Sequence, residues 1–229
     1  MVVALVTAGG VGKRFGGAIP KQFLSIDDKP ILVYTLEKFQ KNDKIDSIIV
    51  ACLDGWQGYL IELKEKYSIS KLKWLAVNGD TQPASISNCV DVLEDKISDD
   101  DIVLIHAGNR PLVSDYIIDN SIETCRKCGN CVTAIKCPEV LVDVVNETII
   151  ERNNVLRIQT PQTFKYGDLK KFYKQLCNFD NVATTCDLAI RLGEKINYID
   201  GSSTNIKITY KDDIIIFKAL FMENGSNVK

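Results

Sequence analysis

The feature that most constrains this chain is the alternation of short, β-branched apolar runs with amphipathic stretches. Each run is apolar almost throughout, rather than at every second residue. Continuous apolarity is typical of strands buried on both faces of a parallel sheet. The runs predict strands at Val2 to Thr7, Ser47 to Cys52, Leu72 to Val77 and Ile102 to His106.

The stretches between these runs have helical spacing. In one of them Ile86, Cys89, Val90 and Leu93 fall on a single helical face. The predicted helices are Ile31 to Gln40, Trp56 to Tyr67 and Pro83 to Leu93. Strands and helices in alternation indicate βαβ units, so the fold class is α/β, with helices on both faces of a mainly parallel, twisted sheet.

The second half of the chain is less regular. It begins with a predicted helix, Asp115 to Lys127, and a strand, Cys131 to Ile135, separated by Gly129-Asn130. Residues 138–160 hold short β-like pieces and predict a small projecting β-arm. The remaining expected elements are helices at Gly167 to Cys177, Thr185 to Leu192 and Lys211 to Met222, and a strand at Ile196 to Ile199.

Composition limits the classes of protein that fit. A chain of 229 residues suits one domain, 1–229, better than two. The formal charge of −2 gives no overall field for nucleic acid or an anionic membrane. The apolar N-terminus is too short for a signal peptide, and no run reaches the ~20 apolar residues of a membrane span. We therefore expect a cytoplasmic protein whose eight cysteines are reduced thiols.

A glycine-rich loop with basic side chains follows the first predicted strand. It runs from Thr7 to Gly17, and Pro20-Lys21-Gln22-Phe23 comes shortly after it. Glycines let backbone N–H groups turn toward an anion, and Arg14 and Lys21 can neutralise phosphate charge. The loop predicts a triphosphate site, the alternative being a mobile glycine turn. It lacks both the Gly-x-Gly-x-x-Gly of dinucleotide folds and the Gly-Lys-Ser/Thr of a P-loop.

Further motifs follow the loop in a recognisable order along nearly the whole chain. They are Asn78-Gly79-Asp80 with Ser85-Ile86, Ile105-His106 with Arg110-Pro111, Gln159 to Phe164, Thr185 with Asp187, and Asn205 to Thr209. In these motifs the chain resembles the cytidylyltransferases that act on 2-C-methyl-D-erythritol 4-phosphate and on ribitol 5-phosphate. The resemblance implies the three-layer fold of nucleotide-diphospho-sugar transferases. It also implies transfer of CMP from CTP to a polyol phosphate, with Mg²⁺, in a homodimer joined through the arm.

The resemblance also assigns roles to individual residues. It implies three catalytic cations around the α-phosphate, Arg14, Lys21 and Lys207. The nucleotide-binding residues that it implies are Ala8, Gly9, Gly10, Gly12, Gly79, Asp80 and Ser85. The polyol phosphate is expected to meet Arg110, Thr185 and Asp187, together with Arg152 from the arm of a dimer partner.

Several positions depart from the pattern of the family. The aspartate expected after His106, which helps to organise the metal and substrate, is Ala107 here, so the metal ligand is unknown. Gln82 replaces an arginine of the erythritol-phosphate enzymes, and Glu139-Val140 replaces their Asp-Thr. Asp54-Gly55-Trp56 and the segment from Gln159 to Phe164 are closer to the ribitol-phosphate branch, which serves surface polysaccharide synthesis through CDP-ribitol.

Three alternatives stay open at this stage. The first is an erythritol-phosphate enzyme of isoprenoid synthesis. The second is a protein that binds CTP but turns it over poorly, because Ala107 has no carboxylate. The third is a Rossmann oxidoreductase, which the basic loop and the missing third glycine disfavour.

Overall fold

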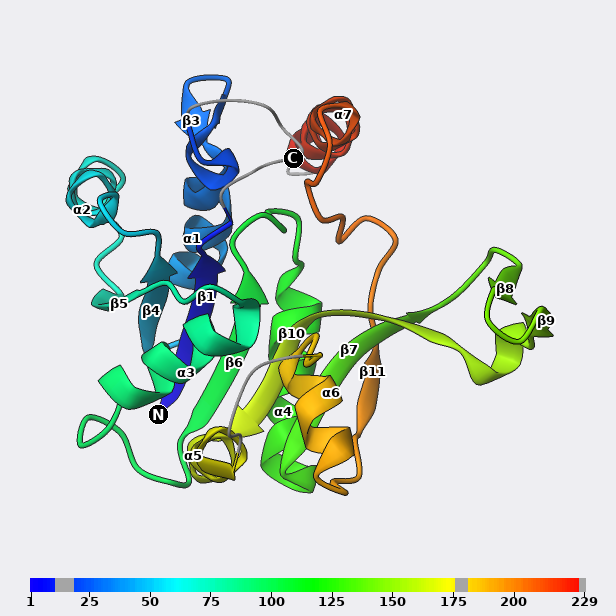
Figure 1. The fold of residues 1–229 in the computed structure, drawn as a ribbon. Coiled ribbons are helices and arrows are strands. Elements are labelled where there is room, and N and C mark those ends of the chain that lie inside the picture. The colour runs from blue at the N-terminus through cyan, green and yellow to red at the C-terminus, as the bar shows by residue number, and fades with distance from the viewer. Residues whose placement is uncertain (11–18, 176–180, 227–229) are drawn as a thin grey trace.

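The computed structural model describes residues 1–10, 19–175 and 181–226, and it is built around one seven-stranded sheet (Figure 1). The strand order is β11-β7-β10-β6-β1-β4-β5. Every neighbouring pair is parallel except the two that β10 makes, with β6 and with β7. The strands are β1 (Val2–Ala8), β4 (Ser47–Cys52), β5 (Leu72–Val77), β6 (Ile102–Ala107), β7 (Asn130–Lys136), β10 (Leu156–Lys165) and β11 (Tyr198–Asp200).

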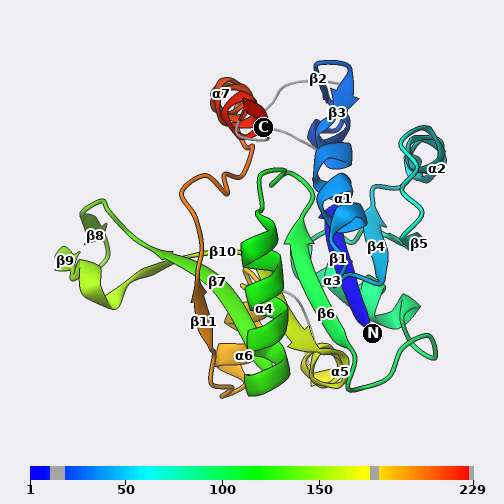
Figure 2. The same cartoon turned by 180° about the vertical axis from the view of Figure 1, so that it is seen from behind.

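Helices cover both faces of the sheet, and the parity of residues along β1 separates the two cores. Val2, Ala4 and Val6 pack with α1 (Ile31–Lys41), α2 (Gln57–Lys66) and α4 (Asp115–Cys128). Val3 and Leu5 pack on the other face with α3 (Gln82–Val92), α5 (Tyr166–Gln175) and α6 (Thr185–Arg191). Figures 1 and 2 show these two layers from opposite sides. The predicted three-layer α/β fold is therefore confirmed.

A narrow arm projects from the sheet. The ends of β7 and β10 extend outward as a pair and carry β8 (Leu141–Asp143), β9 (Thr148–Ile150) and the short helix η2 (Arg152–Asn154) (Figure 1). An arm was predicted for residues 138–160, and residues 156–160 form the outer end of β10. Leu156 and Ile158 alternate with Arg157 and Gln159, but Thr160-Pro161 ends this alternation after four residues, so the sequence pattern of a strand is short there.

The C-terminal part of the chain forms a separate small core. Helix α7 (Asp212–Ser226) inserts Phe217 against Tyr34 of α1, and Ile26 of the hairpin β2 (Ser25–Ile26) and β3 (Lys29–Pro30) joins this cluster. The helix is longer than the predicted one, because it continues past Met222 to Ser226. No helix among the described residues is long and apolar enough to cross a bilayer.

The cysteines in the described part of the chain are free thiols, as predicted. Most are buried within the two cores, and burial raises the pKa of Cys125 and of Cys131 to about 12. They are therefore protonated core residues at neutral pH.

Candidate active site

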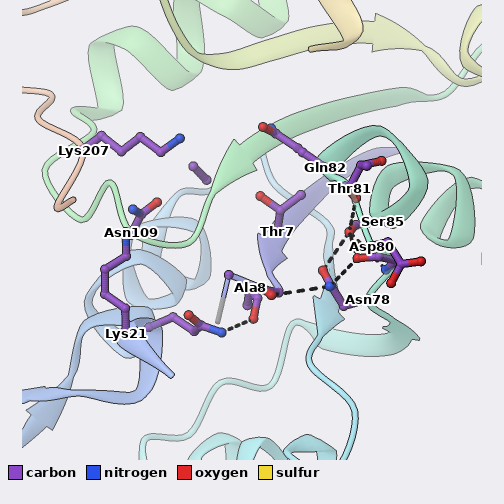
Figure 3. A pocket seen from close by; sticks show the side chains of 15 residues that line it. Thr7, Ala8, Lys21, Asn78, Asp80, Thr81, Gln82, Ser85, Asn109 and Lys207 are labelled. Atoms are coloured by element: carbon purple, nitrogen blue, oxygen red, sulfur yellow. Dashed lines mark hydrogen bonds between the residues drawn. The ribbon is translucent and has the colours of Figure 1, made fainter. Parts of the chain in front are cut away.

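A cavity of about 240 Å³ opens at the carboxyl ends of β1, β5 and β6 (Figure 3). In the sheet, β1 lies between β4 on one side and β6 on the other, so the direction of the chain connections reverses at β1. The cavity therefore lies at a topological switch point of the sheet. Ligands of open α/β sheets bind at such points. The cavity is lined by Thr7, Ala8, Gly9, Gly10, Lys21, Gln22, Asn78, Gly79, Asp80, Thr81, Gln82, Ser85, Ala107, Asn109 and Lys207.

One wall of the cavity is a hydrogen-bonded unit centred on Asn78. The Asn78 side chain accepts a bond from Ser85 Oγ at 2.7 Å and donates to the Gly9 carbonyl at 3.4 Å (Figure 3). The Gly79 N–H donates to Ser85 Oγ at 3.2 Å. Thr81 caps the N-terminus of α3, accepting from the Ala84 N–H. The unit fixes the loop after β5 against the end of β1.

A second wall comes from the short helix η1 (Lys21–Phe23). The buried Gln22 side chain donates a hydrogen bond to the carbonyl of Ala8, the last residue of β1 (Figure 3). This bond holds η1 beside the carboxyl end of β1. Lys21 and Gln22 both line the cavity, so η1 supplies one positive charge to it.

A third wall brings Lys207 to the cavity from the C-terminal segment. Asn109, just after β6, donates from its side chain to the Ile208 carbonyl at 2.6 Å. The Ile208 N–H donates back to the Asn109 carbonyl at 2.9 Å. These two bonds fix the residue next to Lys207, and a second lysine thereby reaches the same cavity (Figure 3).

His106 lies behind this wall and is fully buried. Its Nε2 is 3.0 Å from the Arg110 carbonyl and its Nδ1 is 3.1 Å from Thr160 Oγ1. A carbonyl only accepts, so Nε2 carries the proton and Nδ1 accepts from Thr160. Burial lowers the pKa of His106 to about 3. It is a neutral residue with both ring nitrogens bonded, and it acts as a structural support rather than as a base.

Arg110 and Asn205 lie beside the cavity. Arg110 donates to the Asn205 carbonyl, and Asn205 donates from its side chain to the Thr160 carbonyl at 2.9 Å. Burial, and next the nearby charge of Arg157, lower the pKa of Arg110 to about 10, so it stays positive at neutral pH. The Asn205 Oδ1 atom is buried and accepts no hydrogen bond from any of the described residues.

The structure brings many of the residues predicted from the sequence to one cavity. Eight of them line it: Ala8, Gly9, Gly10, Gly79, Asp80, Ser85, Lys21 and Lys207. Gly12 and Arg14 lie outside the described residues. Arg110 lies next to the cavity, held by Asn205, and is not part of its lining.

The other expected substrate residues lie elsewhere in this chain. Thr185 is buried, with its hydroxyl 2.9 Å from that of Tyr173. Asp187 accepts from the Ala183 N–H and pairs with Arg191 at 2.8 Å. Arg152 is exposed in the arm, donating to the Pro138 carbonyl at 3.3 Å. None of the three lines the cavity, and their substrate roles stay predictions.

Sequence reasoning gave no site role to Asn109, which ties the segment of Lys207 to the sheet. Its position directly after the fourth strand, between Ala107 and Arg110, is the one available signal. Gln22 and Asn78 were part of the motifs, but their structural roles became visible only in their contacts with Ala8 and Gly9.

The described lining of the cavity does not form a protein-held metal site. Its carboxylate is Asp80, which is exposed, and Ala107 offers no side-chain ligand. Across the described residues no group of three His, Cys, Asp or Glu side chains could hold a metal ion. A divalent cation prefers several oxygen ligands, and the described lining supplies one carboxylate toward such a set.

An open, mainly parallel sheet, with backbone glycines and two lysines at its switch point, defines a nucleotide-binding α/β transferase. Comparison with known proteins identifies the family within this class. The family described as 2-C-methyl-D-erythritol 4-phosphate cytidylyltransferase matches residues 2–223. The chain belongs to this cytidylyltransferase family and is a nucleotidyltransferase, which replaces the oxidoreductase alternative.

Individual relatives cover nearly the whole chain. The ribitol-5-phosphate cytidylyltransferase of Lacticaseibacillus paracasei is 38% identical over 97% of this chain and 99% of its own length. The 2-C-methyl-D-erythritol 4-phosphate cytidylyltransferase of Thermosipho africanus is 36% identical over 93% of this chain and 95% of its own. Among solved structures, 4-diphosphocytidyl-2C-methyl-D-erythritol synthase from Anaerococcus prevotii has a TM-score of 0.82 and 25% identity, covering 96% of each chain.

Proposed function

We propose that this protein transfers CMP from CTP to ribitol 5-phosphate, giving CDP-ribitol and pyrophosphate. The observation that carries the proposal is the cavity itself, where Lys21 and Lys207 join a wall of backbone groups at the switch point of the sheet. The choice of ribitol 5-phosphate is supported by the relatives with that activity, at 38% and 37% identity. Methylerythritol phosphate is the second candidate, because erythritol-phosphate enzymes reach 36% identity.

The proposed reaction needs charge neutralisation more than proton transfer. A phosphate oxygen of the polyol phosphate forms a bond to the α-phosphorus of CTP, and the bond to the bridging oxygen breaks. Pyrophosphate leaves with that electron pair. Two anions must approach each other, so Lys21 and Lys207 are suited to offset the repulsion and stabilise the transition state. We assign Arg14 to the same task from the sequence.

A general base is not required, because the attacking phosphate is already an anion near neutral pH. This agrees with the environment of His106, the one histidine of the chain, which is buried and neutral. We assign the phosphate of the polyol to Arg110, which is held by the Asn205 carbonyl and stays positive at neutral pH.

Magnesium and the dimer belong to the proposal as predictions from the resemblance. With one carboxylate in the described lining, Mg²⁺ is expected to be held chiefly by the phosphates of CTP. The arm exposes Val142, Val145 and Ile149, an apolar surface suited to a second copy of the chain. A partner's arm would bring its own Arg152 toward the polyol phosphate. A cytoplasmic location and a place in surface polysaccharide synthesis also stay predictions.

The test is pyrophosphate release from CTP and Mg²⁺ with ribitol 5-phosphate, methylerythritol phosphate or another alditol phosphate in separate reactions. We expect the highest kcat/KM with ribitol 5-phosphate. A higher value with methylerythritol phosphate would assign the protein to the second candidate. CTP binding without release from any substrate would make it a nucleotide-binding protein.

The variant Ala107→Asp belongs in the same assay. It places a carboxylate on the wall of the cavity, where the family has one. We expect its turnover to rise at least tenfold at low Mg²⁺ concentration, because a protein ligand for the cation lowers the cost of assembling the charged complex. Equal turnover of the two proteins at every Mg²⁺ concentration would contradict this expectation.

A further inference from the structure

An aromatic cluster outside the cavity connects the last residue of η1, Phe23, to the start of α2. The ring of Phe23 stacks on that of Trp56, with centroids 4.7 Å apart and planes 15° from parallel. Tyr59 meets both rings edge-on, at 5.7 Å from Phe23 and 5.8 Å from Trp56. Phe23 is buried. None of the three aromatic residues lines the cavity. The cluster is connected to the cavity through Phe23, which follows the lining residues Lys21 and Gln22 in η1.

Helix η1 has few internal restraints. It is three residues long and is closed by two backbone hydrogen bonds, from the Phe23 N–H to the Pro20 carbonyl at 2.9 Å and from the Leu24 N–H to the Lys21 carbonyl at 3.1 Å. Its two cavity residues, Lys21 and Gln22, precede the stacked Phe23 directly. The bond from Gln22 to Ala8 anchors one side of the turn, and the stack on Trp56 anchors the other.

Trp56 is a firm support for this turn. Its backbone N–H donates to the Leu53 carbonyl at 3.1 Å, and its backbone carbonyl accepts from the Leu60 N–H at 3.0 Å at the start of α2. It also packs against the core cluster shared by α1, α2 and α4. A near-parallel aromatic pair has a preferred geometry, so a fixed Trp56 fixes the plane of Phe23.

We propose that Trp56 is a positioning residue of the transferase, holding Lys21 at the α-phosphate of CTP through its stack with Phe23. The inference rests on the proposed role of Lys21 in CMP transfer. A lysine displaced by about 1 Å loses a large part of its effect on a transition state, on the order of 100-fold in rate. The stack on Trp56 thereby determines how strongly the charge of Lys21 stabilises the transition state.

The first experiment compares Trp56→Leu, which removes the stack, with Trp56→Phe, which keeps an aromatic ring. The matched control is Trp74→Leu, because the chain has two tryptophans and Trp74 packs in the other core, away from the cavity. We expect kcat/KM for CTP to fall at least tenfold in Trp56→Leu, to recover largely in Trp56→Phe and to stay near the original value in Trp74→Leu. Equal losses in Trp56→Leu and Trp74→Leu would overturn the inference.

A double-mutant cycle separates positioning from general destabilisation. If Trp56 acts through Lys21, then Trp56→Leu has little further effect in a Lys21→Ala background. The cycle is measured on kcat/KM and on the dissociation constant of CTP by calorimetry. Effects that multiply in both measurements would overturn the inference. A protein that binds CTP but releases no pyrophosphate would overturn the proposed reaction alone, since the affinity cycle still decides the role of Trp56. A protein that binds no CTP would overturn both.

A fluorescence measurement covers the case in which Trp56→Leu fails to fold. Trp74→Phe leaves Trp56 as the sole tryptophan. We expect CTP to change the emission of Trp56 in this variant and expect the change to disappear when Lys21→Ala is added. An emission that does not respond to CTP in a protein that binds it would contradict the coupling.

Discussion

Gly9 and Gly10 follow one another at the end of β1 and line the same cavity, but they meet different surroundings. A Cβ atom on Gly9 would overlap the side-chain amide of Asn78, whereas a Cβ on Gly10 has no atom within 4 Å. Asn78 is held by Ser85 and cannot move without losing that bond. The need for glycine is thus steric at Gly9 and has no steric basis within the described structure at Gly10.

We predict that Gly9→Ala lowers the free energy of unfolding by about 1–3 kcal/mol, because the new methyl group must displace a hydrogen-bonded side chain. Gly10→Ala is the matched control and should change stability by less than about 0.5 kcal/mol. Urea unfolding of both variants checks this. Similar stability of the two would mean that Asn78 can move aside at little cost.

His106 makes stability depend on pH in a defined direction. Burial lowers its folded pKa from 6.5 to about 3. Between these two pKa values the unfolded state binds a proton that the folded state does not bind. The free energy of unfolding therefore rises with pH in this range and decreases as the pH falls below 6.5. The contribution of His106 is therefore present at neutral pH and is lost as the solution is acidified.

We expect His106 to make the protein about 2 kcal/mol less stable at pH 5 than at pH 7. His106→Gln keeps a side-chain donor but does not titrate, so the variant should lose this part of the pH dependence. The measurement is urea unfolding of both proteins at the two pH values. Parallel pH profiles would show that His106 is not the group responsible.

At the scale of elements, the C-terminal segment is the least regular part of the site and the most dependent on side chains. Residues 205–209 form no strand or helix, yet Lys207 must reach the cavity. Asn109 binds both the carbonyl and the N–H of Ile208, and Asn205 binds the carbonyl of Thr160. Three asparagine side-chain and backbone contacts thus replace the missing secondary structure.

We predict that Asn109→Ala lowers kcat/KM for CTP about tenfold or more, because Ile208 loses its side-chain donor and Lys207 gains freedom. Asn88→Ala is the control, since it removes a similar bond, to the Val77 carbonyl at 2.8 Å, outside the lining of the cavity. Steady-state kinetics of both variants checks this. If Asn88→Ala lost as much activity, the effect of Asn109 would not be specific to the segment of Lys207.

At the scale of the whole molecule, the arm is an incomplete structure by itself. Its hairpin pairs two strands of three residues, with Val142 opposite Ile149 and both side chains more than half exposed. A short two-stranded ribbon is marginally stable in water. A second copy of the chain that covers these side chains would stabilise it.

We predict that the protein has twice the monomer mass of 25.6 kDa in light scattering. Val142→Asp combined with Ile149→Asp should give the monomer mass, because two charges cannot be buried in an apolar interface without partners. Ile190→Asp on α6, also an exposed apolar position, is the control and should stay dimeric. A monomeric starting protein would overturn the proposed dimer.

The sequence by itself determined the fold class, the strands β1, β4, β5 and β6, and most members of the cavity. Strand and helix periodicities follow from local geometry, and buried parallel strands carry a continuous apolar signal that needs no tertiary information. The glycine loop with Lys21 and the Asn78-Gly79-Asp80 motif were readable for the same reason, since each is a contiguous pattern. The family resemblance rests on several such contiguous motifs in a fixed order.

Only the tertiary structure decided how distant parts meet. Strand β10 joins the sheet antiparallel although its sequence is interrupted by polar residues and Pro161, because partners on both sides satisfy its backbone. The stack of Phe23 on Trp56 and the bond from Asn109 to Ile208 join residues 33 and 99 positions apart. No local pattern encodes such contacts, because burial and hydrogen bonding are properties of the assembled core.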